Sequence, residues 1–354
     1  MKRILFINGS QFGYLTDLYN YCLYLKDDYD IQYICFDKHL PKVSLDKVKV
    51  TYIPYKGPKL LRGLLYLISC IYKCIIFNGF IFVIYFPKSY LLQKIVFWKK
   101  MHLDIRSLSV SANSKTRYSG DQDIQKAIDQ YKSCSFISQG IKNKMKCRPT
   151  QTIYILPLGA DIISTTHKKY DDIQLLYIGT LTNRNIIDTV IGIKKFTTKY
   201  PDINLIYDIV GDGEDYKTIN EYINSNNLGK YIHLHGMIPH TKLKPFLDTH
   251  NIGISYVPIT EYFEYQPPTK TYEYILSGLF CIATRTYSNK EIINNQNGLL
   301  ISDNENEFSL ALEKFLSIKN RLNDMQIRST LLSHTWKNII DKELRPIIEK
   351  QTSL

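Results

Sequence analysis

The sequence predicts an α/β protein made of two doubly wound parallel sheets. The chain of 354 residues exceeds the length at which one hydrophobic core keeps growing. Short apolar runs alternate with helical patterns along the whole chain, as in parallel-sheet proteins. The composition, 44% hydrophobic and 22% charged, is typical of globular domains. We therefore expect two domains, each with its own core.

The first half begins with a strand, loop and helix unit. An apolar run at residues 3–7 is followed by a glycine-containing polar loop and by a helical pattern over 15–25. The opening run is too short for the core of a secretory signal, so it is interpreted as a strand. Helical stretches separate the later candidate strands and favour a doubly wound lobe. These strands are expected at 31–36, 48–54, 80–86, 133–138 and 152–157.

The second half repeats the alternation more regularly. Helical spacing of apolar residues is clear over 186–191 and 308–316. Polar residues 157–172 show no periodic pattern and are predicted to link two lobes, 1–160 and 161–335. Ligands bind at the carboxyl ends of parallel strands, so the site is expected in the interlobe cleft. The strands are expected at 174–179, 204–211, 231–236, 252–257, 279–284 and 298–302.

Positive charge is concentrated in the first half. Residues 1–170 carry 26 Lys and Arg against 11 Asp and Glu, and the remaining residues carry 19 against 22. Residues 47–103 contain ten Lys and Arg, no acid, and many apolar side chains including Trp98. This pattern favours peripheral contact with an anionic membrane or a phosphate-bearing acceptor. A solvated basic face over ordinary core is the alternative. Because no nucleic-acid-binding signature accompanies the charge, nucleic acid is not expected as a partner.

The cysteines indicate the cellular compartment in which the protein folds. The seven cysteines are scattered, with no CxxC pair and no histidine at zinc-like spacing. They are interpreted as buried thiols of a protein in the reducing cytoplasm. A bilayer-spanning helix between Arg62 and Lys88 is not expected, because Lys73 interrupts that apolar stretch.

Glycines follow several strands of the second half. Gly179 ends the first strand, Gly211 and Gly213 follow the second, and Gly236 ends the third. Glycine lets backbone amides approach a ligand without an intervening side chain. Tight turns that require glycine would explain each position equally well.

The segment YQPPTKTYEYILSGLF, residues 265–280, predicts a short helix with a polar face. Pro267 and Pro268 suit its first turn, and Gly278 suits its end. Lys270 and Glu273 are three residues apart and share a face. The cation can meet a diphosphate at the helix N-terminus, and the carboxylate can accept two adjacent hydroxyls. A simple surface ion pair is the alternative.

Together these segments resemble the family 4 glycosyltransferases, which have the GT-B fold. The resemblance covers most of the second half and is weaker in the first, where SFISQGIKNKM and LPLGAD contribute. SHTWKNIIDKEL, residues 333–344, resembles the family's closing helix, and a helix over about 336–354 is expected to pack back on the first lobe. Trp336 could equally be a simple packing anchor. The matching segments of the second half are 177–185, 208–239, 267–293 and 297–301.

The resemblance implies roles for individual residues. Arg184 and Lys270 would stabilise the donor diphosphate, and Glu273 would bind the ribose hydroxyls. No metal or other cofactor is then needed, and the anomeric configuration is expected to be retained. The donor site is expected to include Gly179, Thr180, Gly211, Gly213, Met237, Ile238, Glu264, Tyr265, Pro268 and Thr269.

Two departures from the family pattern affect specificity. The family often has Glu eight residues before Glu273, where this chain has Tyr265 beside Glu264. In the first lobe, many relatives have a histidine where LDIRSLSV, residues 103–110, offers Asp104, Arg106 and Ser107. The acceptor side is expected to use Gly9, Gln11, Gly13, Arg106 and Ser107.

Two motifs are set aside. Asp121 and Asp123 resemble a metal-binding Asp-x-Asp, but they are expected in a polar loop that caps a helix, so no metal is expected there. His233 and His235 alternate along a strand and share one face, where sheet packing explains them as well as catalysis does.

The sequence thus predicts a glycosyltransferase for UDP- or GDP-hexoses. Its acceptor is expected to be a glycan or a lipid-linked carrier, as in the synthesis of bacterial capsule or lipopolysaccharide. The alternatives are a nucleotide-sugar 2-epimerase of the same fold and a non-catalytic two-lobe binding protein. The basic first half disfavours the epimerase, which has no acceptor.

Overall fold

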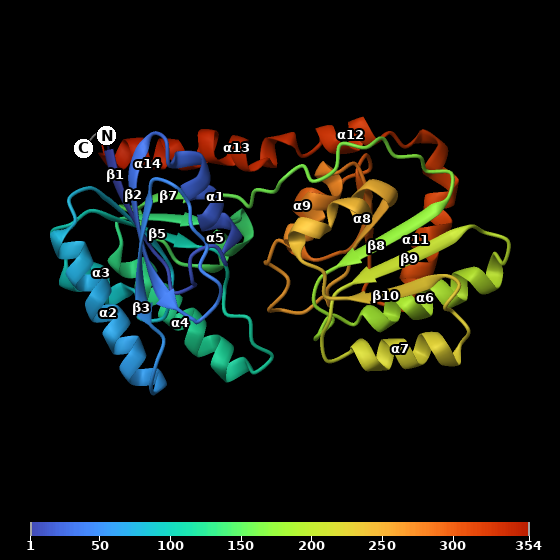
Figure 1. The fold of residues 1–354 in the computed structure, drawn as a ribbon, viewed down its shortest axis with the longest axis horizontal. Helices are drawn as coiled ribbons and strands as arrows, with labels where there is room; N and C mark the ends of the chain where they lie inside the picture. Colours follow the sequence, from blue (N-terminus) through green and yellow to red (C-terminus); the bar gives the residue numbers. More distant parts are fainter. Residues whose placement is uncertain (1, 353–354) are drawn as a thin grey trace. The chain divides into compact units, whose positions relative to one another are not determined.

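The computed structural model describes residues 2–352 and divides the chain into two compact units (Figure 1). Unit 1 combines the residues up to Leu158 with those from Trp336 onward, and unit 2 is Gly159–Thr335. Each unit is a parallel sheet with helices on its faces. The predicted α/β class with two doubly wound lobes is therefore confirmed.

Unit 1 contains a seven-stranded parallel sheet in the order β3-β2-β1-β4-β5-β6-β7. The central strand β4 is wholly apolar, and all five of its residues are buried. Burial on both faces explains why this strand lacks alternation of polar and apolar residues. The strands are β1 Lys2–Ile7, β2 Tyr29–Asp37, β3 Val48–Pro54, β4 Phe80–Ile84, β5 Met101–Ile105, β6 Ser133–Phe136 and β7 Thr152–Ile155.

The helices of unit 1 include the end of the described chain. The indole of Trp336 is 1% exposed and its ring centroid lies 6.2 Å from that of Tyr21, so this side chain anchors the last helices to α1. The helices are α1 Thr16–Leu25, α2 Lys59–Ile76, α3 Tyr90–Ile95, α4 Ser114–Gln130, α5 Gln139–Lys144, α13 Trp336–Ile339, the π-helical turn η4 Ile340–Leu344, and α14 Arg345–Thr352.

The expectation that Asp121 and Asp123 lie in a polar loop and cap a helix was wrong. Asp121 and Asp123 lie in the middle of α4, which begins seven residues earlier because Asn113 caps it by accepting from the Thr116 amide at 3.0 Å. Asp123 accepts from the Tyr85 hydroxyl at 2.9 Å and from the Lys88 amide at 2.8 Å. The carboxylates of this motif thus tie α4 to neighbouring loops.

Unit 2 contains a six-stranded parallel sheet in the order β10-β9-β8-β11-β12-β13. The strands are β8 Ile173–Ile178, β9 Leu205–Val210, β10 Ile232–Gly236, β11 Ile252–Ser255, β12 Phe280–Thr284 and β13 Gly298–Ile301. The α-helices are α6 Ile186–Lys199, α7 Tyr216–Ser225, α8 Lys244–Thr249, α9 Thr269–Leu276, α10 Tyr287–Ile292, α11 Glu305–Ile318 and α12 Asp324–Ser329. The chain order β8, β9, β10 runs outward from the centre and β11 returns to the other side of β8, which creates a switch point between β8 and β11.

Candidate active site

Helix α9 is held at the switch point by side chains on its buried face. The Tyr274 hydroxyl accepts from the Ile178 amide at 2.7 Å, where β8 ends. The Thr271 hydroxyl lies 2.6 Å from that of Ser255 at the end of β11. A Cβ on Gly253 would come within 2.3 Å of the Tyr274 ring, so the close approach of α9 to the sheet requires glycine there.

The ends of α9 follow the prediction with one difference. Pro268 is the residue before the helix rather than part of its first turn. Its fixed φ suits this place, because a residue there needs no intrahelical hydrogen bond from its nitrogen. Gly278 has φ of 81° and ends the helix, as predicted.

Lys270, in the first turn of α9, points toward the end of β8. Its ammonium lies 3.9 Å from the ring centroid of Tyr177, and a Cβ built on Gly179 would lie 3.4 Å from Nζ. Burial and the positive charge of Arg184 lower the pKa of Lys270 to about 7. The structure therefore brings Lys270, Arg184 and Gly179 together, and the two cations repel each other.

Arg184 is presented by an unusual loop between β8 and α6. Its neighbours Asn183 and Asn185 both have positive φ, at 55° and 52°. Asparagine tolerates this conformation better than most residues. The guanidinium stacks over Phe263 at 4.2 Å from the ring centroid, which orients it. Of the residues that the structure describes, none offers Arg184 or Lys270 a carboxylate at ion-pair distance.

The loops after β8 and β9 interlock through glycine. A Cβ on Gly211 would stand 1.8 Å from the Gly179 carbonyl oxygen, and one on Gly213 would stand 2.5 Å from the Thr182 nitrogen. The Leu181 amide donates to the Asp212 carbonyl at 2.9 Å. Glycine is thus required for loop packing at the carboxyl ends of these strands, which is the edge where open α/β sheets bind ligands.

Glu273 has a partner that the sequence did not indicate. The Nε2 atom of His240, just after the β10 loop, lies 3.0 Å from Oε1 of Glu273. This hydrogen bond raises the pKa of His240. Burial, followed by the charge of Glu273, raises the pKa of Asp161. No local pattern links these three residues, because they meet only through the tertiary fold.

Glu264 and Tyr265, the candidates for the missing glutamate, both lie near α10. Oε1 of Glu264 accepts from the Tyr287 amide at 2.9 Å, at the start of that helix. The ring of Tyr265 contacts the ring of Tyr287, with centroids 5.0 Å apart. One carboxylate oxygen of Glu264 is therefore committed to the backbone of α10.

The remaining predicted donor residues occupy loop positions in unit 2. Met237, after β10, is 80% exposed, and Ile238 beside it is half-buried. The Thr180 carbonyl accepts from the Tyr177 hydroxyl at 2.7 Å. Thr269 begins α9 one residue before Lys270. These residues follow β8, β10 and β11, at the same edge of the sheet as Gly211.

In unit 1 the predicted acceptor-side residues are mostly committed to internal contacts. Gln11 is fully buried; its amide nitrogen donates to the Leu40 carbonyl at 2.7 Å, and its oxygen accepts from the Lys38 amide at 2.8 Å. Gly13 has φ of 90°, and a Cβ there would lie 2.5 Å from Val43. Gly9 lies near Phe36, with room for a methyl group.

Arg106 lies in a buried ionic network. Its Nε donates to Asp17 at 2.6 Å and its Nη1 to the Leu156 carbonyl at 2.7 Å, while Asp104 is 3.8 Å away. The side chain is 9% exposed. Burial raises the pKa of Asp104 to about 6, against the opposing effect of Arg106. Ser107, the next residue, is half-buried.

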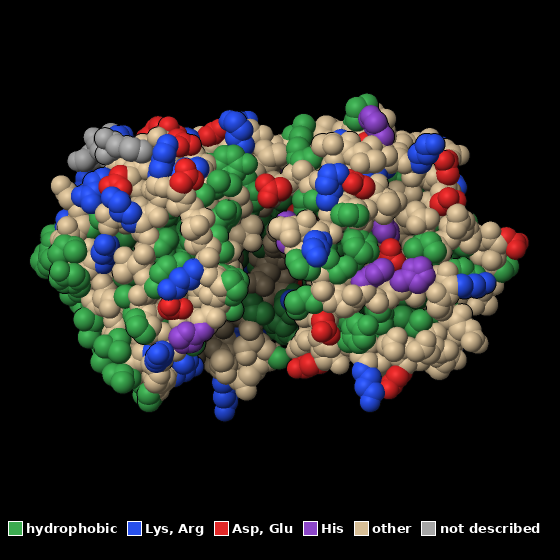
Figure 2. All heavy atoms as spheres, in the orientation of Figure 1, with side chains coloured by type: hydrophobic (Ala, Val, Ile, Leu, Met, Phe, Trp, Pro, Cys, Tyr) green, Lys and Arg blue, Asp and Glu red, His purple; other side chains and the backbone are tan. Residues whose placement is uncertain are grey.

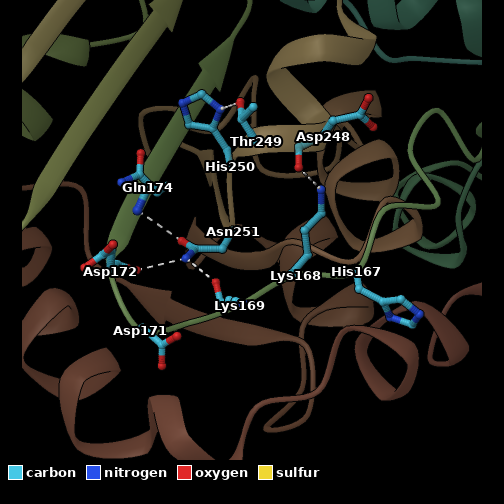
Figure 3. A pocket seen from close by; sticks show the side chains of 10 residues that line it. All are labelled: His167, Lys168, Lys169, Asp171, Asp172, Gln174, Asp248, Thr249, His250 and Asn251. Atoms are coloured by element: carbon cyan, nitrogen blue, oxygen red, sulfur yellow. Dashed lines mark hydrogen bonds between the residues drawn. The ribbon is translucent and has the colours of Figure 1, made fainter.

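Unit 2 also has a hollow of about 390 Å³ at the opposite edge of its sheet (Figure 3). Asn251, just before β11, bonds the backbones of Lys169, Asp172 and Gln174 there. Lys168 donates to the Asp248 carbonyl at 3.0 Å, near the end of α8. Because it lies at the amino ends of β8 and β11, this hollow is separate from the loops around Lys270.

Comparison with known proteins places these features in context. Residues 161–330 match the family model described as Glycosyl transferases group 1. No curated protein matches the chain. Among solved structures, a sucrose-phosphate synthase from Thermosynechococcus elongatus superposes with a TM-score of 0.79 and 14% identity, covering 100% of both chains.

Two further structures share the fold. Anabaena HepE in complex with UDP and glucose has a TM-score of 0.76 and 12% identity over 100% of both chains. The lipopolysaccharide outer core galactosyltransferase WaaB has a TM-score of 0.73 and 15% identity over 99% of this chain and 100% of that one. Unit 2 thus matches a glycosyltransferase family model, and the whole chain shares the GT-B fold with these structures.

Proposed function

We propose that the protein transfers a hexose-type sugar from a uridine diphosphate donor to a glycan or lipid-linked acceptor, with retention of configuration. The observation that carries the proposal is the pairing of Arg184 and Lys270 beside Gly179. Two cations that repel each other and have no described carboxylate partner are suited to bind an anion that carries at least two negative charges.

The chemistry that follows is electrostatic. As the bond from the sugar to the diphosphate breaks, negative charge grows on the leaving phosphate oxygen. Arg184 and Lys270 would stabilise that charge, and the first turn of α9 would add its free amides. The positive charges of these groups take the place that a divalent ion has in metal-dependent transferases, so we propose that the transfer needs no metal.

Glu273 would recognise the ribose. An ionised carboxylate accepts only, and two adjacent hydroxyls can donate to its two oxygens. His240 already donates to Oε1 at 3.0 Å, so it would orient the carboxylate and leave Oε2 available. Glu264 or Tyr265 would meet the sugar from the loop before α9.

The choice of uridine rests on the structural relatives. HepE is seen with UDP, with UDP and glucose, and with UDP-glucose. A trehalose-6-phosphate protein of E. coli is seen with UDP-2-fluoro glucose. These proteins share the fold, and the proposal extends their donor class to this chain; a GDP-sugar is the alternative that the experiment below separates.

A membrane surface is the proposed location of the acceptor. Helix α2 exposes Leu60, Leu64, Ile68 and Tyr72, spaced four residues apart on one face, and Leu64 is 53% exposed. Figure 2 shows the hydrophobic side chains gathered at this edge of unit 1. Such a face beside exposed lysines is suited to lie in the interface of an anionic bilayer.

A second exposed apolar pair follows α3, the helix that contacts α2. Phe97 and Trp98, after α3, are 75% and 56% exposed, and Lys94 and Lys100 flank them. Among the helices that the structure describes, none combines the length and the hydropathy needed to cross a bilayer. We therefore propose peripheral contact at the inner face of the cytoplasmic membrane, with a role in surface polysaccharide synthesis such as that of capsule or lipopolysaccharide.

The experiment that tests the proposed function is a panel of nucleotides and nucleotide sugars. UDP, GDP, CMP and their common hexose conjugates are added without metal and then with Mg²⁺, and the melting temperature is followed because a bound ligand stabilises the native state. Mass spectrometry then follows each donor. A metal-independent shift with UDP and slow hydrolysis of one UDP-hexose support the proposal. An isomerised donor would indicate the epimerase, and no shift with any nucleotide would contradict the proposed donor.

A further inference from the structure

A cluster of three histidines surrounds one carboxylate in the sheet of unit 2. Oδ1 of Asp208, on β9, lies 3.0 Å from Nδ1 of His233 and 3.0 Å from Nε2 of His235, both on β10. Oδ2 of Asp208 lies 3.0 Å from Nε2 of His250, which follows α8. We refer to Asp208, His233, His235 and His250 as the histidine cluster.

The backbone explains why these residues meet. Asp208 pairs directly with His233 in the register of β9 and β10. His235 is two residues along β10 and shares the face of His233. Helix α8 covers this face and brings His250 to it, and the Phe246 ring of α8 packs against His235 with centroids 5.0 Å apart. Asp208, His233 and His235 thus offer three possible ligands from two strands, and His250 lies beside them.

The hydrogen bonds of His250 fix its protonation. Nδ1 lies 2.7 Å from the Phe246 carbonyl oxygen, which can only accept. The Thr249 hydroxyl donates to the Pro245 carbonyl at 3.0 Å, so it too serves as an acceptor for Nδ1, at 3.1 Å (Figure 3). Nδ1 must therefore carry a proton, and in a neutral imidazole Nε2 is then a bare lone pair.

The lone pair on Nε2 of His250 faces the carboxylate of Asp208, and His250 is buried. His250 is 3% exposed, and its Nε2 atom has no hydrogen-bond partner of acceptable geometry among the described residues. Two electron pairs 3.0 Å apart repel each other, so a positive charge is required near them. The charge can be a proton on His250, which makes it an imidazolium, or a metal ion bound to Asp208 beside it.

The surroundings favour the metal. A proton on His250 explains its own contact. His233 and His235 each place an imidazole nitrogen 3.0 Å from Oδ1, where either a donated hydrogen bond or a shared metal ion satisfies the carboxylate. Donor atoms of Asp208, His233 and His235 all lie within 4.8 Å of one another, which one metal ion can span.

We propose that Asp208, His233 and His235 of the histidine cluster bind a divalent transition-metal ion, with zinc as the best fit. Imidazole nitrogens with one carboxylate form a ligand set typical of Zn²⁺, and a poor one for Mg²⁺ or Ca²⁺, which prefer oxygen. His233 and His235 are 44% and 31% exposed at their side chains, so an ion can enter from solvent. The site is distinct from Arg184 and Lys270 and takes no part in the proposed transfer.

The position of the cluster suggests what the ion does. β9 leads into the loop of Gly211, and β10 leads into the loop that carries Met237 and His240. An ion that joins β9 and β10 would hold the edge of the sheet from which these loops emerge. We expect the site to stabilise unit 2.

The test uses the full chain, treated with a chelator and then titrated with ZnCl₂ or MgCl₂ alone. Zn²⁺ should bind in a 1:1 ratio and survive buffer exchange. At a hundredfold excess over Kd, the melting temperature of unit 2 should rise by about 5–10 °C. Mg²⁺ should produce no such rise.

Variants assign the binding to the cluster. His233→Ala with His235→Ala should abolish the 1:1 binding, and both positions are partly exposed, so the fold should persist by circular dichroism. His39→Asn, at an exposed histidine of unit 1, is the matched control and should bind as wild type. Absence of 1:1 zinc binding, or unchanged binding in the double variant, would overturn the proposal and leave a buried imidazolium. Co²⁺ absorption, lost in the same double variant, is a second readout.

Discussion

The imidazole of His240 donates from Nε2 to Oε1 of Glu273 across 3.0 Å, which joins the loop after β10 to helix α9. Only 13% of the Glu273 side chain is exposed, whereas 58% of His240 is. The carboxylate is thus the inner partner of the pair. Glu273 is therefore the residue proposed to contact the ribose, and His240 is the residue that orients its carboxylate.

Replacing Glu273 by Ala should weaken UDP binding by about 100-fold, because two hydrogen bonds to a charged acceptor are lost. His240→Gln should cost far less, since glutamine can still donate to the carboxylate. Calorimetric titration with UDP measures both. Equal losses in the two variants would contradict direct contact of Glu273 with the ribose.

Lys270 should take up a proton when the donor binds. Its pKa is lowered to about 7 in the free protein by burial and by Arg184, so at pH 8 it is mostly neutral. A diphosphate beside it would raise that pKa and draw in a proton. Titrating UDP at pH 8 in buffers of different ionisation enthalpy measures the uptake, which should vanish in Lys270→Met and should fade below pH 6.

The same shift predicts how stability depends on pH. In the free protein the folded pKa of Lys270, about 7, lies below the usual value of 10.5. The unfolded chain therefore binds more protons between these values, and this group makes the protein gain stability as pH rises from 7 toward 10. Lys270→Met should remove that gain and should also lower turnover. An unchanged pH dependence in the variant would contradict the burial of the ammonium.

Gly211→Ala should disrupt the loops after β8 and β9. The added Cβ would stand 1.8 Å from the Gly179 carbonyl oxygen, so the loops must move apart. We expect a loss of about 2–4 kcal/mol in the free energy of unfolding, together with weaker UDP binding. Gly229→Ala is the control, because a Cβ there meets nothing within 4 Å. Urea denaturation of both variants makes the comparison.

Aspartate on the exposed face of α2 should reduce membrane binding. The pair Leu64→Asp and Ile68→Asp replaces apolar side chains that are 53% and 52% exposed. Co-sedimentation with vesicles containing anionic lipid should fall strongly, while activity toward a soluble acceptor stays unchanged. Leu310→Asp, at a 55% exposed position of α11, is the matched control. If the wild-type protein bound zwitterionic vesicles as strongly as anionic ones, the proposed attraction between its lysines and anionic lipid would be contradicted.

Arg106 should prove to support the fold of unit 1. Removing its charge in Arg106→Met leaves Asp17 buried and unpaired, which should cost about 3–5 kcal/mol of stability. Adding Asp17→Leu should recover part of this loss, because the uncompensated charge is then gone. A contact with the acceptor alone would instead leave the unfolding curve unchanged and raise KM.

The α/β class and the position of nearly every strand were predictable from the sequence. Strands such as β4, with five consecutive buried apolar residues, and helices such as α6 carry strong local patterns. The end of α9 at Gly278 was predictable for the same local reason, since its positive φ favours glycine. The start of α4 was not predictable in this way. The Asp121 and Asp123 carboxylates resemble a helix cap in the sequence, yet they accept hydrogen bonds from distant loops.

What the sequence determined by itself is therefore the succession of elements and the chemistry of α9, because periodicity, turn residues and helix spacing act over a few residues. The tertiary structure decided which distant groups meet: His240 with Glu273, Arg106 with Asp17, and His250 with Asp208. Each of these pairs joins separate elements, and strand order brings them together. Such contacts depend on packing and leave no local pattern in the chain.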